Sequence, residues 1–293
     1  MSIYLTGASG FVGKNLITNF NKDFDIKKHT RGSEFLIKQN TVIHLAGKAH
    51  DLKNISNKDE YYEVNTELTK QIFDSFLISD SSVFIMLSSV KAVADNVVGI
   101  LNEDCEPNPK THYGKSKLLA ESYILSKKIP NNKRVYILRP CMIHGPNNKG
   151  NLNLLYKLVS KRIPWILGAF KNMRSYCSID NLLFVINELI HNNAIPSGVY
   201  NVADDEHLST NEIISLMAKS NNKKTIIFNV YPFIIKIIAK IGDVIPLPLN
   251  SERLKKLTES YMVSNEKLKK YMSKELPLTS KKGVIKTFKS FKN

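Results

Sequence analysis

Residues 1–13 constrain the fold of this chain more than any other stretch. A run typical of a β-strand, Ser2 to Thr6, leads into the sequence GASGFVG, and an amphipathic helical pattern follows. Strand, glycine-rich turn and helix are together the context of a dinucleotide-binding fingerprint. In such a turn one glycine makes the tight bend, a second lets backbone N–H groups approach a pyrophosphate, and a third lets the helix pack on the strand. The motif predicts a nucleotide-binding α/β domain, with cofactor contacts from Gly7, Ser9, Gly10, Phe11, Val12 and Gly13.

The next predicted strand, Phe24 to Thr30, should end beside the adenosine ribose of a bound dinucleotide. An acidic residue there would hold the 2′-hydroxyl of NAD, but this chain has His29-Thr30-Arg31. Arg31 could pair with the 2′-phosphate of NADP, although a surface arginine in a turn explains the same residue equally well. The stretch from Arg31 to the following strand, Thr41 to Ala46, is too short for a helix, a strand and their loops. One strand of the usual fold is therefore predicted to be missing.

The chemistry is predicted to lie in His112-Tyr113-Gly114-Lys115-Ser116-Lys117, which follows a proline-rich loop and opens a helical pattern. Residues four apart share one face of a helix, so the Lys117 ammonium should lie near the Tyr113 phenol. A free phenol has a pKa near 10, and a nearby cation lowers it towards the range useful for proton transfer. By spacing alone, a buried tyrosine beside a solvated lysine is an equally good interpretation.

A formal net charge of +16 raises the question of nucleic-acid binding. The basic C-terminal stretch from Lys267 to Lys292 lacks the aromatic interleaving and the recognition motifs of nucleic-acid modules. We therefore expect a solvated basic surface, one that suits a small anionic substrate, and no nucleic-acid partner.

The cysteines and histidines are scattered along the chain. Cys105, Cys141 and Cys177 have no metal-ligand spacing, so we expect reduced thiols in a cytoplasmic protein and no metal site. The chain starts with a structural motif and not with a signal peptide.

The longest apolar stretch, Tyr231 to Leu249, is interrupted by Lys236, Lys240, Asp243 and prolines, so we expect no membrane span. We expect an amphipathic helix that packs on the protein's own core; the alternative is a helix on a membrane surface.

Six motifs occur in a characteristic order: TGASGFVG, HLAG, VN, LSSVKAV, YGKSK and LRPCMIHGP. In this order they resemble the extended short-chain dehydrogenases/reductases, the NAD-dependent epimerase/dehydratase group that acts on nucleotide sugars. The resemblance implies an α/β fold: a Rossmann-type doubly wound parallel sheet with a smaller, interleaved C-terminal substrate lobe. It places the dinucleotide-binding domain in residues 1–148, with a returning strand near 198–204, and mainly the substrate lobe in 149–293.

The resemblance also implies residue roles. Ser89 would orient the reacting oxygen, Tyr113 would transfer the proton, and Lys117 would lower the tyrosine pKa and hold the nicotinamide ribose. Further cofactor contacts would come from Leu45, Ala46, Gly47 and Pro140, and substrate contacts from Lys48, Ser89, Arg174 and Arg253. Arg174 would bind the substrate pyrophosphate.

The chain departs from the family pattern at two places. Ala92-Val93-Ala94 stands where relatives have Val-Tyr-Gly, and the Gly-Asp that contacts adenine has no counterpart. The chain resembles most the branch that reduces 4-keto groups of UDP-linked 6-deoxy-hexosamines for surface polysaccharide such as O-antigen or capsule. A reductase releases its cofactor every turnover, which suits a cofactor site without the acidic ribose ligand. Arg31 favours NADP(H), and NAD(H) is possible.

Three further expectations follow from the resemblance. One alternative function is an NAD-dependent C4 epimerase of UDP-hexose or UDP-N-acetylhexosamine, and another is a non-catalytic nucleotide-binding or scaffold protein. Helices over Tyr61–Leu77 and His112–Leu125 are expected to pair across a two-fold axis in a homodimer.

Overall fold

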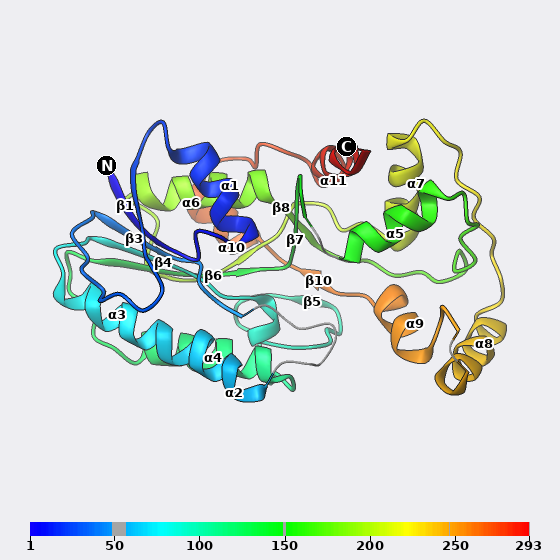
Figure 1. The fold of residues 1–293 in the computed structure, drawn as a ribbon, viewed down its shortest axis with the longest axis horizontal. Helices are drawn as coiled ribbons and strands as arrows, with labels where there is room; N and C mark the ends of the chain where they lie inside the picture. The colour runs from blue at the N-terminus through cyan, green and yellow to red at the C-terminus, as the bar shows by residue number, and fades with distance from the viewer. Residues whose placement is uncertain (49–56, 149–150, 246, 293) are drawn as a thin grey trace.

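A six-stranded parallel sheet organises the molecule (Figure 1). The computed structural model describes residues 1–48, 57–148, 151–245 and 247–292. The sheet has the order β2-β1-β3-β4-β6-β9, and all neighbouring strands run parallel. The strands are β1 Ser2–Thr6, β2 Asp25–Lys28, β3 Thr41–His44, β4 Val83–Leu87, β6 Arg134–Pro140 and β9 Gly198–Val202. The predicted Rossmann-type sheet is confirmed.

The edge of the sheet next to β2 is truncated. β2 pairs only with β1 in the sheet, and the described chain forms no strand between Lys28 and Thr41. A doubly wound dinucleotide fold ordinarily has a further strand at this edge. The missing strand predicted from the short spacing is therefore confirmed.

Helices cover both faces of the sheet because its strands alternate their side chains between two cores. In β4, Val83 and Ile85 face one core, whereas Phe84 and Met86 face the other. The first core lies under α1 (Phe11–Phe20), α6 (Ile179–His191) and α10 (Glu266–Met272). The second lies under α3 (Leu68–Ile78) and α4 (His112–Leu125). α3 continues a helical run that starts with α2 (Lys58–Tyr62) and contains a π-helical turn at Glu63–Glu67.

A second, smaller unit has its own apolar core around Trp165, Ile213 and Phe288. Its helices are α5 Asn151–Ser160, α7 Thr210–Ser220, α8 Pro232–Val244, α9 Ser251–Thr258 and α11 Ser280–Lys289. A capping box between Ser209 and Glu212 starts α7. Two short parallel pairs connect the units: β5 (Ile100–Leu101) with β10 (Met262–Val263), and β7 (Met142–His144) with β8 (Tyr176–Ser178). Because α6, β9 and α10 return to the sheet, the two units are interleaved along the chain.

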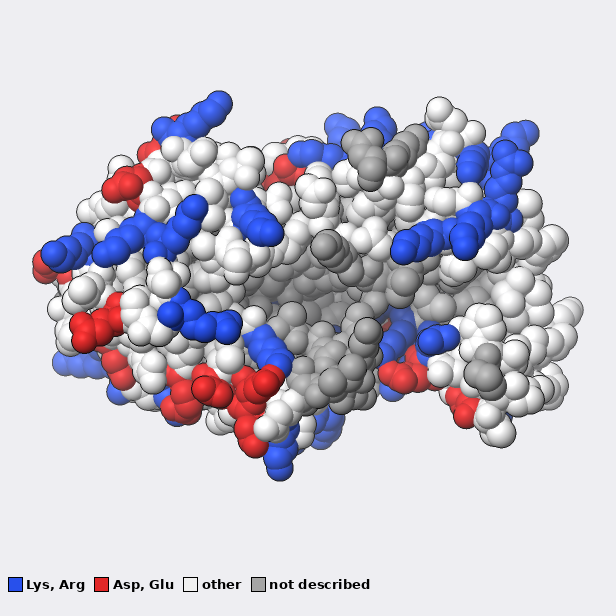
Figure 2. Space-filling view, in the orientation of Figure 1, with Lys and Arg blue, Asp and Glu red and all other residues white. Residues whose placement is uncertain are grey.

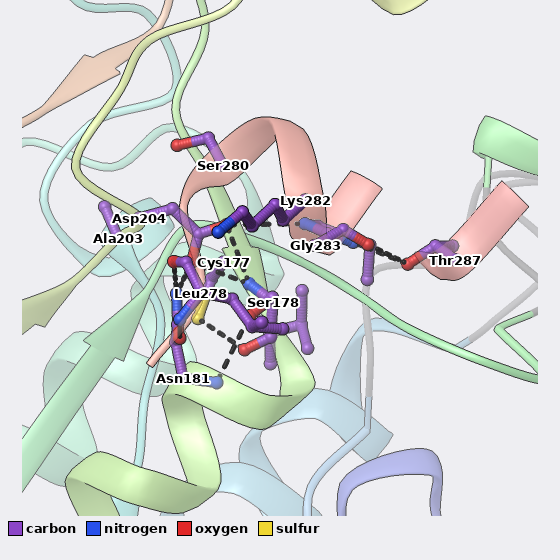
Figure 3. Close-up of polar contacts among 12 residues, drawn as sticks. Cys177, Ser178, Asn181, Ala203, Asp204, Leu278, Ser280, Lys282, Gly283 and Thr287 are labelled. Carbon is purple, nitrogen blue, oxygen red and sulfur yellow. Dashed lines mark hydrogen bonds and ion pairs between the residues drawn. The ribbon is translucent and has the colours of Figure 1, made fainter. Parts of the chain in front are cut away.

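A buried carboxylate fixes the C-terminal segment to the first turn of α6 (Figure 3). Asp204, just after β9, accepts hydrogen bonds from the backbone N–H of Ser178 at 3.0 Å and from Nδ2 of Asn181 at 2.7 Å. The same amide group of Asn181 donates to the carbonyl oxygen of Leu278 at 2.8 Å, and its Oδ1 accepts from the N–H of Leu278 at 3.0 Å. These bonds hold the approach to α11 against the sheet unit.

α8 differs from what its sequence pattern led us to expect. Ile235, Ala239 and Gly242 are buried, but the other apolar side chains of the helix are exposed. The prediction of an amphipathic helix packed on the protein's own core therefore holds for one narrow face only. No helix in the described part of the chain has the length and apolar character needed to cross a membrane.

Candidate active site

Two adjacent serines at the carboxyl end of β4 have different partners. Ser89 caps the 3₁₀ turn Val90–Ala92, accepting from the Lys91 N–H at 3.2 Å, and its side chain hydrogen-bonds with Tyr113. Ser88 instead points to the other side and donates to the carboxylate of Glu121. Of the two serines, Ser89 is thus the one that lies beside the tyrosine, although its role in the reaction stays a prediction.

The start of α4 is fixed so that Tyr113 meets this turn. Thr111 caps the helix by accepting from the N–H of Gly114 at 3.2 Å. The Asp95 carboxylate accepts from the N–H of Lys110 at 2.6 Å and from the Thr111 hydroxyl at 3.1 Å. A Cβ at Gly114 would lie 2.4 Å from the carbonyl oxygen of Lys91, so only glycine allows the helix this close to the serine turn.

Tyr113 is half-buried, and its phenol remains protonated at neutral pH. Burial raises the pKa of Tyr113, while its hydrogen bond with Ser89 lowers that pKa and the nearby Tyr61 and Glu121 raise it further. The rings of Tyr113 and Tyr61 lie edge to face, with centroids 6.3 Å apart. In this structure the pKa of Tyr113 is therefore shifted opposite to our expectation, because burial outweighs the expected effect of Lys117.

Lys117 is buried one helical turn beyond Tyr113, with only 4% of its surface exposed. Its ammonium donates to the carbonyl oxygen of Leu87 at 3.0 Å. It also lies against Gly47 in the loop after β3, because a Cβ at Gly47 would be 2.9 Å from Lys117 Nζ. Burial lowers the pKa of Lys117 to about 8, and the Glu121 carboxylate opposes that change.

A buried ion pair beneath Lys117 was not singled out from the sequence. Arg139 Nη2 lies 2.5 Å from Glu121 Oε2, and Arg139 Nε donates to the same carboxylate at 3.0 Å and 3.1 Å. Both side chains are nearly inaccessible, at 5% and 1%. The signal was available, since Glu121 follows Lys117 by four residues and so continues the helix face of Tyr113 and Lys117.

Asn65 in the π-helical turn holds the loop that follows β3. Its Oδ1 accepts from the N–H of Lys48 at 2.7 Å, and its Nδ2 donates to the Ser116 hydroxyl at 3.0 Å. π-turns occur frequently at functional sites. The sequence alone did not identify this contact.

The glycine-rich turn brings the start of α1 against the backbone of the first turn and of the loop after β3. Gly7 has φ of 72°, and a Cβ there would lie 2.5 Å from the backbone nitrogen of Ala46. A Cβ at Gly13 would lie 2.3 Å from the carbonyl oxygen of Gly7, so α1 packs directly on the turn. Gly10 caps α1 without a side-chain hydrogen bond, and no acidic residue stands in the first turn. The helix N-terminus therefore suits an anion.

The other predicted cofactor residues lie at the same edge of the sheet. Leu45 and Ala46 follow β3, and Pro140 is the last residue of β6. Arg31 is exposed in the turn after β2. His29, which precedes it, accepts or donates a 2.8 Å hydrogen bond with the Tyr4 hydroxyl and stacks on Phe35 with ring centroids 4.7 Å apart.

The predicted substrate residues are engaged by the protein itself. Arg174 donates to the carbonyl oxygen of Lys256 at 2.6 Å and lies 3.7 Å from Glu259. The Lys48 ammonium forms an ion pair with Glu60.

Arg253 and Lys91 lie on the predicted substrate side as well. Arg253 is exposed and donates to the carbonyl oxygen of Pro248 at 2.7 Å, and none of its described contacts is with Arg174. Lys91, which the sequence did not single out, lies 4.1 Å from the ring centroid of Tyr261. Burial lowers the pKa of Lys91, the Glu259 carboxylate opposes this, and Arg174 adds to it. Lys91 therefore shares the electrostatic environment of Arg174.

No group of three or more His, Cys, Asp and Glu side chains in the described ranges could hold a metal ion.

Comparison with known proteins agrees with this fold. The model of the "NAD dependent epimerase/dehydratase family" matches residues 3–203. A UDP-glucose 4-epimerase of Vibrio cholerae is 29% identical over 318 residues, which cover 99% of this chain and 95% of that protein. An N-acetyl-alpha-D-glucosaminyl-diphospho-ditrans,octacis-undecaprenol 4-epimerase of Escherichia coli O157:H7 is 28% identical over 245 residues, covering 76% of this chain and 73% of that protein. The solved UDP-glucuronic acid 4-epimerase of Bacillus cereus in complex with NAD has a TM-score of 0.76 at 20% identity, covering 100% and 99% of the two chains.

Proposed function

Because the chain belongs to the NAD dependent epimerase/dehydratase family of short-chain dehydrogenases/reductases, we propose that it is a 4-ketoreductase of a nucleotide-linked sugar. Enzymes of this family act on nucleotide sugars, and this chain is one of them. The proposed substrate is a UDP-linked 6-deoxy-hexosamine with a keto group at C4. The proposed product enters surface polysaccharide.

The described residues suit proton delivery to a carbonyl oxygen. A bound nicotinamide would supply the hydride to C4. Ser89 and Tyr113 share a hydrogen bond at the carboxyl end of β4, so both hydroxyls can reach one substrate oxygen. Tyr113 gives its proton to the C4 oxygen as the hydride arrives, and the Lys117 cation, one turn away, stabilises the resulting phenolate.

The cofactor edge of the sheet is the observation that supports a reductase. The segment His29 to Ser33 has no acidic residue to hold a ribose 2′-hydroxyl, and no strand follows it before Thr41. A cofactor with fewer contacts at this end leaves more readily, as a reductase requires in every turnover. Exposed Arg31 is positioned after β2, where a 2′-phosphate of NADPH would lie.

A C4 epimerase is the second candidate, and the names of the two relatives favour it. An epimerase removes a hydride and returns it to the other face of C4, so its NAD stays bound. The non-catalytic alternative is disfavoured because nucleotide binding alone does not require a tyrosine that is hydrogen-bonded to Ser89 and lies one helical turn from a buried lysine.

The experiment measures cofactor content and turnover together. Purified protein is denatured and its nicotinamide quantified, and a panel of UDP- and dTDP-4-keto sugars is then offered with NADPH or NADH. We expect substoichiometric cofactor and NADPH oxidation that depends on a 4-keto sugar. Arg31→Ser should weaken NADPH binding by about tenfold and leave NADH binding unchanged. Stoichiometric NAD and unaided interconversion of UDP-GlcNAc with UDP-GalNAc would replace the reductase by the epimerase.

Assembly and location remain proposals. Leu119 and Leu125 on α4 are 50% and 58% exposed, and Ile78 at the end of α3 is 89% exposed. These side chains support a homodimer through α3 and α4, to be checked by sedimentation at micromolar protein. Free Cys105, Cys141 and Cys177 support a cytoplasmic location.

A further inference from the structure

α8 presents a broad apolar face away from the protein. An α-helix turns by about 100° per residue, so its side chains can be placed around the axis. The buried face is narrow and consists of Ile235, Ala239 and Gly242. A strip with Lys236, Lys240 and Asp243 lies beside it. The remaining arc, about 140° wide, holds Phe233, Ile234, Ile237, Ile238, Ile241, Val244 and, just beyond the helix, Ile245.

The apolar arc is exposed along its whole length. Phe233 is 73% exposed, Ile234 46%, Ile237 42%, Ile241 46% and Val244 88%. Residues before the helix extend the surface, with Phe228 at 52% and Tyr231 at 77%. On the face shown in Figure 2, the right-hand end of the molecule, where α8 lies, is mostly uncharged. Contiguous exposed apolar surface of this kind marks an interaction site in a folded protein.

We propose that this face, which we call the α8 face, is a membrane-docking surface that lies in the headgroup region of an anionic bilayer. An interfacial helix has a wide apolar face and lysines on its polar side, and it lies in the plane of the membrane without spanning it. α8 meets each condition: its apolar arc is continuous, and Lys236 and Lys240 stand exposed at the edge of that arc.

The charges around the α8 face favour anionic lipid over a second copy of the chain. The acidic residue of α8, Asp243, is exposed but already accepts hydrogen bonds from the N–H and hydroxyl of Ser251, at 2.9 Å and 2.6 Å. Lys255 is exposed on α9, and Glu252 is paired with Lys256. A two-fold contact would place the same surface on both sides, and so would set lysines opposite a surface whose two acids, Asp243 and Glu252, already have partners. Phosphate headgroups neutralise those lysines.

Docking here would also place the predicted substrate side near the membrane. α8 packs against α9, and the carbonyl oxygen of Lys256 on α9 holds Arg174. The docking surface and the expected diphosphate site are thus joined through one short helix. The proposal concerns binding alone and does not depend on the reaction that the enzyme carries out.

Vesicle co-sedimentation of the full chain tests the proposal. The probes are vesicles of phosphatidylglycerol with phosphatidylethanolamine and, for comparison, of phosphatidylcholine. We expect binding to the anionic vesicles only. Ile237→Ser with Ile241→Ser should reduce binding at least tenfold, because the two substitutions remove apolar surface from the middle of the arc. Lys236→Gln with Lys240→Gln should reduce it by about 20-fold and weaken its dependence on salt.

A matched control separates this face from apolar exposure in general. Leu36 and Val98 are 59% and 103% exposed on the sheet unit, so Leu36→Ser with Val98→Ser should leave vesicle binding unchanged. Circular dichroism checks that each variant is folded. The proposal is overturned if the wild type does not bind anionic vesicles, or if the α8 variants bind as well as it does. A concentration-dependent dimer that Ile237→Ser with Ile241→Ser dissociates, without vesicle binding, would assign the face to self-association instead.

Discussion

The sheet unit and the smaller unit treat their charged side chains differently. In the sheet unit, Lys117, Glu121 and Arg139 are buried and held by specific partners behind Tyr113. In the smaller unit and its borders, Arg174 and Arg253 are more accessible and bond to backbone carbonyl oxygens of their own neighbourhood. The sheet unit is therefore organised for chemistry in advance, whereas a ligand of the other unit has to displace contacts that already exist.

This difference assigns separate tasks to the two regions. Preorganised groups act on a developing charge without a cost of rearrangement. Exchangeable contacts, by contrast, let substrate recognition vary while the chemistry stays the same. Substitutions in the sheet unit should change the rate or the stability, and substitutions at Arg174 should change substrate affinity.

Replacement of Tyr113 by Phe gives the largest expected change. It removes the proton donor and keeps the ring, so kcat should fall by ~10²–10⁴ while the thermal midpoint stays close to that of the wild type. Turnover is followed by NADPH oxidation with a 4-keto sugar, and unfolding by circular dichroism. A variant within a few-fold of the wild-type rate would show that another group supplies the proton.

Glu121→Gln tests how much the buried ion pair of the sheet unit contributes to the stability of the protein. It leaves the Arg139 guanidinium buried without its carboxylate, which costs about 3–5 kcal/mol when a buried pair is broken. Chemical denaturation measures the free energy of unfolding. The double variant Glu121→Gln with Arg139→Met removes both charges and should recover most of that loss. A single variant that loses less than about 1 kcal/mol would mean that the pair contributes no more than a surface one.

The sequence predicted the scaffold well because its signals are local. The glycines of the first turn and the short spacing after Arg31 both reflect backbone geometry. The direction of the Tyr113 pKa shift could not be read in this way, because burial depends on side chains such as Tyr61 that arrive from another helix. The exposure of α8 was missed for a related reason. An apolar helix has the same pattern whether its partner is the protein core or something outside it.

Arg174→Ala tests whether the exchangeable contacts of Arg174 determine substrate affinity. Loss of a charge-assisted contact to a diphosphate should cost roughly 1.5–3 kcal/mol in binding, seen as a higher KM with a nearly unchanged kcat. Glu259→Gln is the matched change, because it removes the carboxylate 3.7 Å from Arg174 and should lower KM slightly. An unchanged KM in Arg174→Ala would move the diphosphate site elsewhere, with Arg253 the next residue to replace.

The smallest expected effect is a pH dependence in which activity and stability move in opposite directions. Burial places the pKa of Lys117 at about 8 in the folded protein, below the 10.5 of a free lysine. As the pH rises through about 8, Lys117 loses the positive charge that stabilises the Tyr113 phenolate. We therefore expect kcat to fall, at a rate that approaches tenfold per pH unit. Between pH 8 and 10.5 the unfolded chain binds more protons at this site than the folded one. The free energy of unfolding should therefore rise with pH over this window, by at most about 1.4 kcal/mol per pH unit.

Lys117→Met isolates that contribution. Burial also lowers the pKa of Lys91 and of Lys133, so both add to the slope of the wild type. Measurements below pH 10 avoid Tyr113, whose raised pKa gives the opposite sign at higher pH. The variant keeps the contributions of the other lysines and loses that of Lys117, so its unfolding free energy should rise less steeply between pH 8 and pH 9.5. Equal slopes in the two proteins would mean that Lys117 keeps an ordinary pKa despite its burial, and that the fall in kcat needs a different titrating group.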